Sequence, residues 1–169
     1  MNKSITLAAL AAALAVSGCA KKPPKELPPA PAAESTTPPD GSGIENQILP
    51  GSRADFLRSV PADRIFFDTD SFSVDDQDRA TLDAQAAWLQ RNPNVRITIE
   101  GHCDERGTRE YNLALGDRRA NAAKNYLQSR GIDASRMTVI SWGKERPDAL
   151  GSDESAWSRN RRAVTVVPQ

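Results

Sequence analysis

The stretch NVRITIEGHCDERGTREYNLALGDRRANAAKNYLQSRG, residues 94–131, contains a strand pattern followed at once by a helix pattern. Apolar and polar side chains alternate in its first part, with Ile97 and Ile99 on one side, which predicts a half-buried β-strand. From residue 111 onward apolar residues recur at helical spacing, and Gly131 is a typical helix stop. A strand that leads directly into a helix favours a fold of the α/β class.

The segments on either side repeat this alternation of strand and helix. Upstream, RIFFD at Arg64–Asp68 is a short apolar run typical of a buried strand. Residues 73–93 predict a helix that begins with Ser73 and Asp76 in capping-box spacing. Downstream, the sequence predicts a strand over 136–143, a short helical turn over 152–162 and a last strand over 163–167.

Each of the two long predicted helices has an apolar face. The residues on these faces are Leu82, Ala86 and Leu89 in the first helix, and Leu115, Ala122 and Tyr126 in the second. Strands that alternate with such helices predict an α/β two-layer sandwich, in which helices cover one face of a small sheet in the order βαβαββ.

The N-terminus has the features of a bacterial export signal. Residues 1–18 carry one charge, Lys3, before an apolar run too short for a bilayer span, which needs about 20 residues. The sequence VSGC then places small residues before Cys19 and is similar to the lipobox of bacterial lipoproteins. This similarity implies that Cys19 is acylated after cleavage, and Ala20 behind it implies sorting to the outer membrane. Ordinary cleavage that leaves Cys19 free is the alternative.

Residues 21–43 are rich in proline and contain no aromatic residue, which predicts a disordered linker of up to roughly 70 Å. We therefore expect a signal peptide at 1–18, the lipidated cysteine and linker at 19–50, and a folded domain at 51–169. Four apolar residues near this boundary are expected to pack on the domain: Ile48, Leu49, Phe56 and Leu57.

The composition argues against some classes of function. The 22 basic and 22 acidic residues cancel, so the chain lacks the basic excess of an electrostatic nucleic-acid binder. With Cys19 acylated, Cys103 is the remaining thiol, and no disulfide within the chain is expected.

The charged run from Glu100 to Asn121 allows three interpretations. A thiol enzyme would need a base within reach of Cys103. If the strand continues, however, Cys103 faces away from His102 and Asp104, and the chain has one histidine. Cys103 is instead expected to fill a small buried position. The second interpretation is a metal site, but the spacing of these side chains matches neither zinc nor calcium, so we expect no metal and no cofactor.

The third interpretation is recognition of a small charged group. Asp104 is expected at the end of a strand, where open α/β sheets bind ligands. Helical spacing draws Arg119 toward the apolar face together with Asn112, and turns Arg118 outward. A carboxylate and a guanidinium at one cleft can hold the two charges of a zwitterion. By spacing alone, pairing of Asp104 and Arg119 with each other or with water is the favoured alternative.

Four motifs in the same order resemble a known family. The segments FFDTDSF, IEGHCDERGTREYNLALGDRRANAAKNYL, SWGKERP and WSRNRRAV, spread over residues 64–167, are similar to the OmpA-like peptidoglycan-binding domain. The lipobox and the form GHxDERGT are similar, more narrowly, to the peptidoglycan-associated lipoproteins of that family. The resemblance implies helices on a mixed sheet, and a non-catalytic domain that binds the diaminopimelate of the peptidoglycan stem peptide.

The resemblance also implies roles for individual residues. Asp104 and Arg119 occupy the positions of the two ligand anchors of the family, the aspartate for the ammonium group and the arginine for the carboxylate. The further residues implied to line the cleft are Phe67, Asp68, Thr69, Asp70, Asn112 and Arg161. Cys103 is a departure, since relatives usually carry alanine or threonine there.

The implied function is a lipid-anchored tether that faces the periplasm and joins the outer membrane to the cell wall. The implied partners are peptidoglycan, TolB and other components of the Tol–Pal system, which acts in envelope integrity and cell division. Two alternatives remain open. One is a cell-wall enzyme that depends on Cys103, and the other is a lipoprotein whose main role is to dock TolB.

Overall fold

The computed structural model of the protein describes residues 48–168. The predictions for the signal peptide at 1–18, for Cys19 and for most of the linker lie outside these residues. None of the helices within 48–168 has both the length and the apolar character that a membrane crossing requires.

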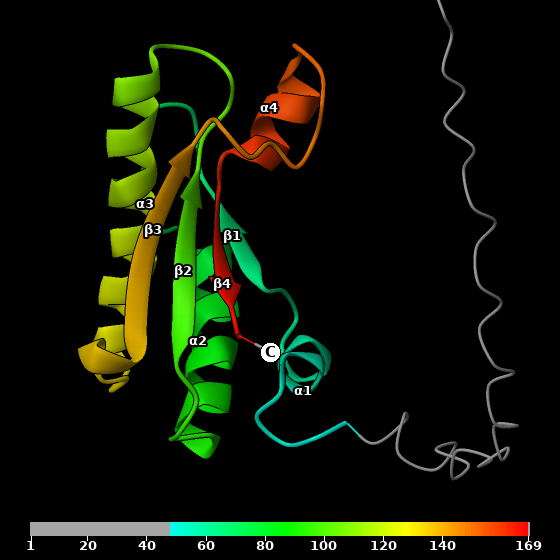
Figure 1. The fold of residues 1–169 in the computed structure, drawn as a ribbon, viewed down its shortest axis with the longest axis vertical. Helices are drawn as coiled ribbons and strands as arrows, with labels where there is room; N and C mark the ends of the chain where they lie inside the picture. Colours follow the sequence, from blue (N-terminus) through cyan, green and yellow to red (C-terminus); the bar gives the residue numbers. More distant parts are fainter. Residues whose placement is uncertain (1–47, 169) are drawn as a thin grey trace, which may run out of the picture. The chain divides into compact units, whose positions relative to one another are not determined.

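The described chain forms a four-stranded mixed sheet with helices on one face. Its elements are α1 (Arg53–Ser59), β1 (Arg64–Phe66), α2 (Asp76–Arg91), β2 (Ile97–His102), α3 (Arg109–Ser129), the 3₁₀ turn η1 (Ala134–Arg136), β3 (Met137–Gly143), α4 (Glu154–Asn160) and β4 (Arg162–Val166). The strand order is β1-β4-β2-β3, with β2 and β3 parallel and the other pairs antiparallel. In Figure 1, α2 and α3 lie together along the sheet, whereas α4 lies at one end of it. The predicted fold class and element order are confirmed.

The helix faces agree with the sequence pattern in α2 and differ by one residue in α3. The predicted residues of α2, Leu82, Ala86 and Leu89, are buried in the core. In α3 the buried stripe contains Ala123 and Leu127, whereas the predicted Ala122 and Tyr126 are half-buried. The run of alanines in α3 gives no contrast between neighbouring positions, so periodicity cannot resolve a shift of one residue.

The predicted start of α2 was wrong by two residues. The N-cap is Asp75, whose side chain accepts a hydrogen bond from the N–H of Asp78. Ser73 lies before the helix, and its N–H donates to the hydroxyl of Ser71 instead. Ser73 and Asp75 both have the side chain of an N-cap, and the loop that leads from β1 decides which one is used.

The apolar residues near the domain boundary behave differently from the prediction. Only Phe56, in the short helix α1, is buried; its ring meets Trp88 edge-on, with 5.0 Å between the ring centroids. Ile48, Leu49 and Leu57 are exposed. Ile48 and Leu49 lie before α1, and Phe56 and Leu57 are adjacent in it, about 100° apart around the helix axis, so Phe56 can face the core while Leu57 faces solvent.

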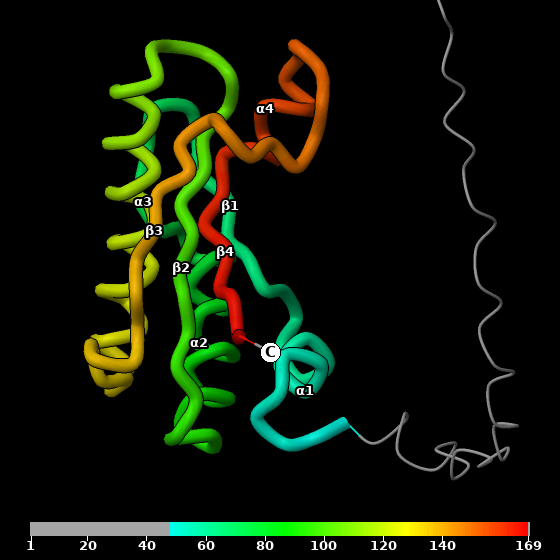
Figure 2. The backbone as a smooth tube through the Cα atoms, viewed as in Figure 1, coloured from blue at the N-terminus to red at the C-terminus, as the bar shows by residue number. Residues whose placement is uncertain are grey.

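The tube view shows how the chain builds one end of the sheet. The connection that leaves β2 for α3 and the helix α4 both lie at this end, above the ends of β1 and β2 (Figure 2). The N–H of Phe67, just after β1, donates to the carbonyl of Arg161, just before β4, at 3.0 Å. Segments that are far apart in sequence therefore meet at this end of the sheet.

Candidate functional site

The loop after β1, the loop after β2 and the first turns of α3 enclose a cavity of about 280 Å³. Its lining carries two carboxylates and two guanidinium groups, and the remaining residues are polar, small or apolar. The lining residues are Thr69, Asp70, Cys103, Asp104, Arg106, Gly107, Tyr111, Asn112, Leu115 and Arg119.

The structure brings most of the predicted site residues to this cavity. Asp104, Arg119, Thr69, Asp70 and Asn112 all line it. The other three, Phe67, Asp68 and Arg161, border a neighbouring hollow of about 390 Å³ between the loop after β1 and α4. They therefore support the loops around the cavity, and their side chains do not form its wall.

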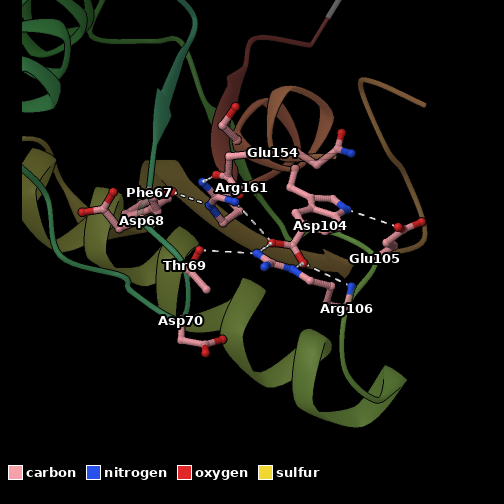
Figure 3. Close-up of polar contacts among 12 residues, drawn as sticks. Phe67, Asp68, Thr69, Asp70, Asp104, Glu105, Arg106, Glu154 and Arg161 are labelled. Atoms are coloured by element: carbon pink, nitrogen blue, oxygen red, sulfur yellow. Dashed lines mark hydrogen bonds and ion pairs between the residues drawn. The ribbon is translucent and has the colours of Figure 1, made fainter. Parts of the chain in front are cut away.

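Asp104 lies just beyond the end of β2 and is buried between two arginines (Figure 3). Its Oδ1 accepts hydrogen bonds from the backbone N–H and from Nε of Arg106, each at 3.1 Å. Its Oδ2 accepts from Nη2 of Arg106 at 2.7 Å and from Nη1 of Arg161 at 3.5 Å. Burial works to raise the pKa of Asp104, but the bonds from Arg106 and Arg161 outweigh it and hold the pKa below its ordinary value. Asp104 is therefore a charged carboxylate in the ligand-free domain.

Arg119 is fully buried on the inner face of α3, as its helical position predicted, and Arg118 is exposed. Its guanidinium donates to three main-chain carbonyls: Nε to Ser71 at 2.8 Å, Nη1 to His102 at 2.9 Å and Nη2 to Asp68 at 3.0 Å. Arg119 thus joins the loop after β1 to the end of β2. A guanidinium has five N–H donors, so two remain for a group inside the cavity.

The alternative from spacing was that Asp104 and Arg119 pair with each other or with water, and its first half, the mutual pair, does not describe this site. Within the described chain each has other hydrogen-bonding partners, the carboxylate taking Arg106 and Arg161 and the guanidinium taking carbonyls. Both side chains nevertheless line the same cavity. A ligand between them would meet one fixed negative and one fixed positive group.

The loop after β1 adds a second carboxylate to the cavity. Asp70 has a φ of +54°, a left-handed conformation that few residues other than glycine adopt. Its Oδ1 accepts a hydrogen bond from the hydroxyl of Tyr111, at 3.2 Å, across the cavity mouth. Beside it, the hydroxyl of Thr69 accepts from Nη2 of Arg106 at 3.3 Å.

Asn112 and Cys103 shape the floor of the cavity. The amide of Asn112 donates to the carbonyls of Arg106 and Thr108, at 2.7 and 3.0 Å, and so holds the loop after β2 in its turn. The thiol of Cys103 is 2% exposed and donates to the carbonyl of Asn112. The burial of Cys103 was predicted, but we expected its side chain to face away from Asp104. Cys103 and Asp104 line the same cavity because β2 ends at His102, where the alternation of sides stops.

His102 lies on the other face of the sheet. A Cβ added to its neighbour Gly101 would meet the backbone of α3, so Gly101 faces the helices and His102 faces away from them. Its ring is buried near Glu100, with 3.5 Å between Nε2 and Oε2. Burial, and then the charge of Arg162, lowers the pKa of His102 to about 4. This histidine is neutral and lies on the opposite side of the sheet from Cys103.

Sequence reasoning missed Arg106 and Tyr111 among the charged and polar residues of the cavity wall. Arg106 also lies over the ring of Trp157 in α4, with 4.2 Å from its guanidinium carbon to the ring centroid. The indole N–H of Trp157 in turn donates to Glu105 at 3.1 Å. A bond between Asp104 and the residue two positions later depends on the turn that the loop adopts, so spacing in the sequence gives no signal for it.

Within residues 48–168, no group of three or more histidine, cysteine, aspartate or glutamate side chains is placed to hold a metal ion. The chemistry offered by the cavity is therefore that of charged and hydrogen-bonding side chains and of the loop backbone.

Comparison with known proteins agrees with this architecture. The profile of the OmpA family matches residues 66–161. The peptidoglycan-associated lipoprotein of Rhizobium meliloti is 55% identical over 162 residues, which cover 94% of this chain and 85% of that protein. The lipoprotein of the same name from Agrobacterium fabrum is 54% identical over 159 residues, with the same shares covered.

Solved structures show the same fold. The crystal structure of the peptidoglycan-associated lipoprotein from Burkholderia pseudomallei has a TM-score of 0.62 and 45% identity, over 67% of this chain and 93% of that one. The C-terminal domain of Helicobacter pylori MotB, at 18% identity and a TM-score of 0.59, covers 63% of this chain and 84% of its own and shares the fold alone. With its profile match, its high identity to curated relatives and its mixed sheet, the chain belongs to the OmpA family, in the group of the peptidoglycan-associated lipoproteins.

Proposed function

We propose that the domain binds peptidoglycan without covalent chemistry, by holding the zwitterionic end of diaminopimelate in the cavity. The observation that carries this proposal is that Asp104 and Arg119, which are charged and buried, line one cavity without pairing to each other. The end of the diaminopimelate side chain carries an ammonium group and a carboxylate. Asp104 offers an acceptor for the first, and the two unused N–H groups of Arg119 offer donors for the second.

The size of the cavity supports a small polar head group. About 280 Å³ is below the range of about 300 to 1,000 Å³ that is typical of sites for drug-sized ligands. Leu115 on its wall offers an apolar contact for a methylene chain. The cavity therefore suits one amino-acid end of a stem peptide, with the rest of the peptide and the glycan outside.

The protein is a binding protein and not an enzyme. Its relatives are named for their association with peptidoglycan and for their lipid, and these names state no catalytic activity. The geometry around Cys103 agrees. Burial raises the pKa of the Cys103 thiol, and the one histidine of the chain lies across the sheet from it. A thiol nucleophile needs a base within hydrogen-bonding distance, which His102 cannot supply from that face.

In the cell, we propose that the protein is a tether between the outer membrane and the cell wall. The names of the relatives and the sequence before Cys19 support a lipid anchor, and the proline-rich segment supports a spacer between anchor and domain. By the same resemblance, TolB and the other Tol–Pal components in envelope integrity and cell division are proposed as partners. Each contact with the wall would be weak. Many copies of the protein in one membrane would still bind the wall firmly, because their anchors keep the effective concentration of the domains near the wall high.

Cosedimentation with purified sacculi tests the proposed site. The full chain is purified in detergent and compared with Asp104→Asn, which keeps the shape of the side chain but removes its charge. We expect retention to fall at least about tenfold, since a charge-assisted bond to the ligand is lost. Asp117→Asn, an exposed acid on α3 outside the cavity, is the matched control and should bind as the wild type does.

Competition defines the ligand. Free meso-diaminopimelate should release the wild-type protein from sacculi, and cadaverine, which has two ammonium groups but no carboxylate, should release it less well. A folded Asp104→Asn protein that stays on sacculi as firmly as the wild type would contradict the assigned site.

A further inference from the structure

The carboxylate of Asp104 has no free acceptor position in the ligand-free domain. An ionised carboxylate offers about four lone-pair sites on two oxygens. Oδ1 accepts two hydrogen bonds from Arg106, and Oδ2 accepts one from Arg106 and one from Arg161. An ammonium group that approaches Asp104 therefore finds its positions taken by arginine.

The two arginines differ in how easily they can leave. Arg161 is 5% exposed, and its other nitrogens donate to the carbonyl of Phe67 and to Glu154. The side chain of Arg106 is 40% exposed, and besides Asp104 it has one longer bond, to Thr69, and the face of Trp157. Arg106 is the donor that a ligand can displace.

We propose that Arg106 is an internal competitor for the cationic end of the ligand. In the empty site its guanidinium occupies the acceptor positions on Asp104 that an ammonium group needs, and binding exchanges one cation for the other. This inference rests on the proposed role of Asp104 as the ammonium anchor. It assigns Arg106 a function that neither Asp104 nor Arg119 has. Arg106 sets how strongly a ligand must bind to Asp104 in order to displace the guanidinium.

The exchange also makes the site selective for zwitterions. A ligand with an ammonium group alone displaces Arg106 and leaves its guanidinium without a carboxylate. A ligand that brings its own carboxylate into the cavity offers the displaced guanidinium a new partner, since Arg106 is part of the cavity wall. Arg106 therefore disfavours simple amines such as cadaverine more than it disfavours diaminopimelate.

The contact with Trp157 gives the exchange a spectroscopic signal. The guanidinium of Arg106 lies over this indole ring, so its departure changes the surroundings of Trp157. Trp88 is in the core beside Phe56, away from the cavity wall. Tryptophan emission should thus change when meso-diaminopimelate binds, and the change should be absent in Trp157→Phe.

The test compares Arg106→Gln, Arg106→Lys and the control Arg109→Gln in competition for sacculi. Arg109 is an exposed arginine on α3, paired with Glu145, so its loss makes the same change in net charge outside the cavity. In Arg106→Gln we expect cadaverine to compete about three to ten times better than in the wild type, and the preference for meso-diaminopimelate over cadaverine to shrink by the same factor. Arg106→Lys should lie between, because an ammonium group cannot form the two parallel bonds of a guanidinium fork. Arg109→Gln should match the wild type.

Each outcome decides the proposal. If Arg106→Gln is folded by circular dichroism but cadaverine competes no better than in the wild type, Arg106 is only a structural support. If Arg106→Gln does not fold, two other measurements test the proposal in the same way. These are the competition with Arg106→Lys and the change in Trp157 emission when meso-diaminopimelate binds. If the wild type itself is not released by meso-diaminopimelate, and Asp104→Asn binds sacculi normally, it is the proposed function that fails.

Discussion

Arg118 and Arg119 are neighbours in the chain with opposite environments. Arg118 is exposed and lies near the ring of Phe72, with 5.9 Å from its guanidinium carbon to the ring centroid. Arg119 is buried without an ion-pair partner in the described structure, and burial lowers its pKa; the cost of burying its charge is offset by three carbonyl oxygens. Because main-chain carbonyls compensate the charge of Arg119, the segments that carry these carbonyls depend on Arg119 for their hydrogen bonds.

Arg119→Met should therefore destabilise the domain strongly. Three buried or half-buried carbonyls lose their donor, and we expect the free energy of unfolding to fall by at least about 3 kcal/mol. Urea denaturation followed by circular dichroism measures this loss. Arg118→Met is the control, and it should lower the free energy of unfolding by well under half as much. Equal effects of the two substitutions would show that the carbonyl bonds of Arg119 contribute little.

His102 provides a pH prediction with a single reporter, since the chain has one histidine. Its pKa is lowered from 6.5 to about 4, first by burial and then by Arg162. The folded state keeps the ring neutral where the unfolded chain binds a proton. This contribution to stability is therefore complete above pH 6.5, is lost as the pH falls toward 4, and amounts to roughly 3 kcal/mol. NMR titration of the imidazole should give a midpoint near pH 4, and a midpoint above 6 would contradict the burial argument.

At the scale of elements, the packing of α3 on β2 depends on two glycines. A Cβ built on Gly101 would lie 1.8 Å from the carbonyl oxygen of Gly116, and one on Gly116 would lie 2.4 Å from the hydroxyl of Ser141. Gly116 lowers the intrinsic stability of the helix by about 1 kcal/mol relative to alanine. Its position is explained by the close approach of helix and strand, which places Asn112 and Arg119 next to the end of β2.

Gly101→Ala should force α3 away from the sheet. The added methyl group meets backbone, which cannot rotate aside, so we expect a loss of about 3 kcal/mol or more in unfolding free energy and weaker retention on sacculi. Gly131→Ala is the control: its φ of +87° strains an alanine, but no atom lies within 4 Å of the added carbon. It should cost about 1 kcal/mol. A smaller effect at position 101 than at 131, in the same urea experiment, would show that the helix accommodates the methyl group.

The elements themselves followed largely from local patterns. Ile97 and Ile99 are buried and their neighbours half-buried or exposed, as strand alternation predicted, and Gly131 ends α3 as expected. The errors occurred where several residues competed for one role, as at the start of α2. There Asp75 rather than Ser73 caps the helix, because the preceding loop determines which side chain reaches the free N–H groups.

At the scale of the whole described domain, the cavity exists because separate parts of the chain meet at one end of the sheet. Arg161, just after α4, bonds to Phe67 in the loop after β1, and Arg106, in the loop after β2, bonds to Thr69 (Figure 3). Arg106 also contacts Trp157 in α4, and Arg119 in α3 bonds to Asp68. Cys103 lies inside this junction, with its thiol on the carbonyl of Asn112. The reactivity of this thiol therefore reports whether the junction is intact.

The thiol of Cys103 should be protected in the native state. With Cys19→Ser to leave one thiol, we expect dithionitrobenzoate to react at least about a hundredfold more slowly in buffer than in 8 M urea, since burial raises the pKa and blocks access. Fast labelling in buffer would mean that the loop after β2 opens readily. Saturating meso-diaminopimelate should slow the labelling further, and cadaverine should slow it less.

Local patterns were enough to predict the order of strands and helices from β1 onward, the inward face of α2, the burial of Arg119 and the position of Asp104 at a strand end. All of these depend on residues within one or two turns of each other, where the periods of helix and strand apply. Which charges meet depends on the three-dimensional packing of the chain. Asp104 takes Arg106 and Arg161, and Arg119 takes the carbonyls of Asp68, Ser71 and His102. Arg106 lies two positions from Asp104, but its bond depends on the turn of the loop, and the other partners lie 17 to 57 positions away in the chain. A short-range pattern carries no record of which loops the folded sheet brings together.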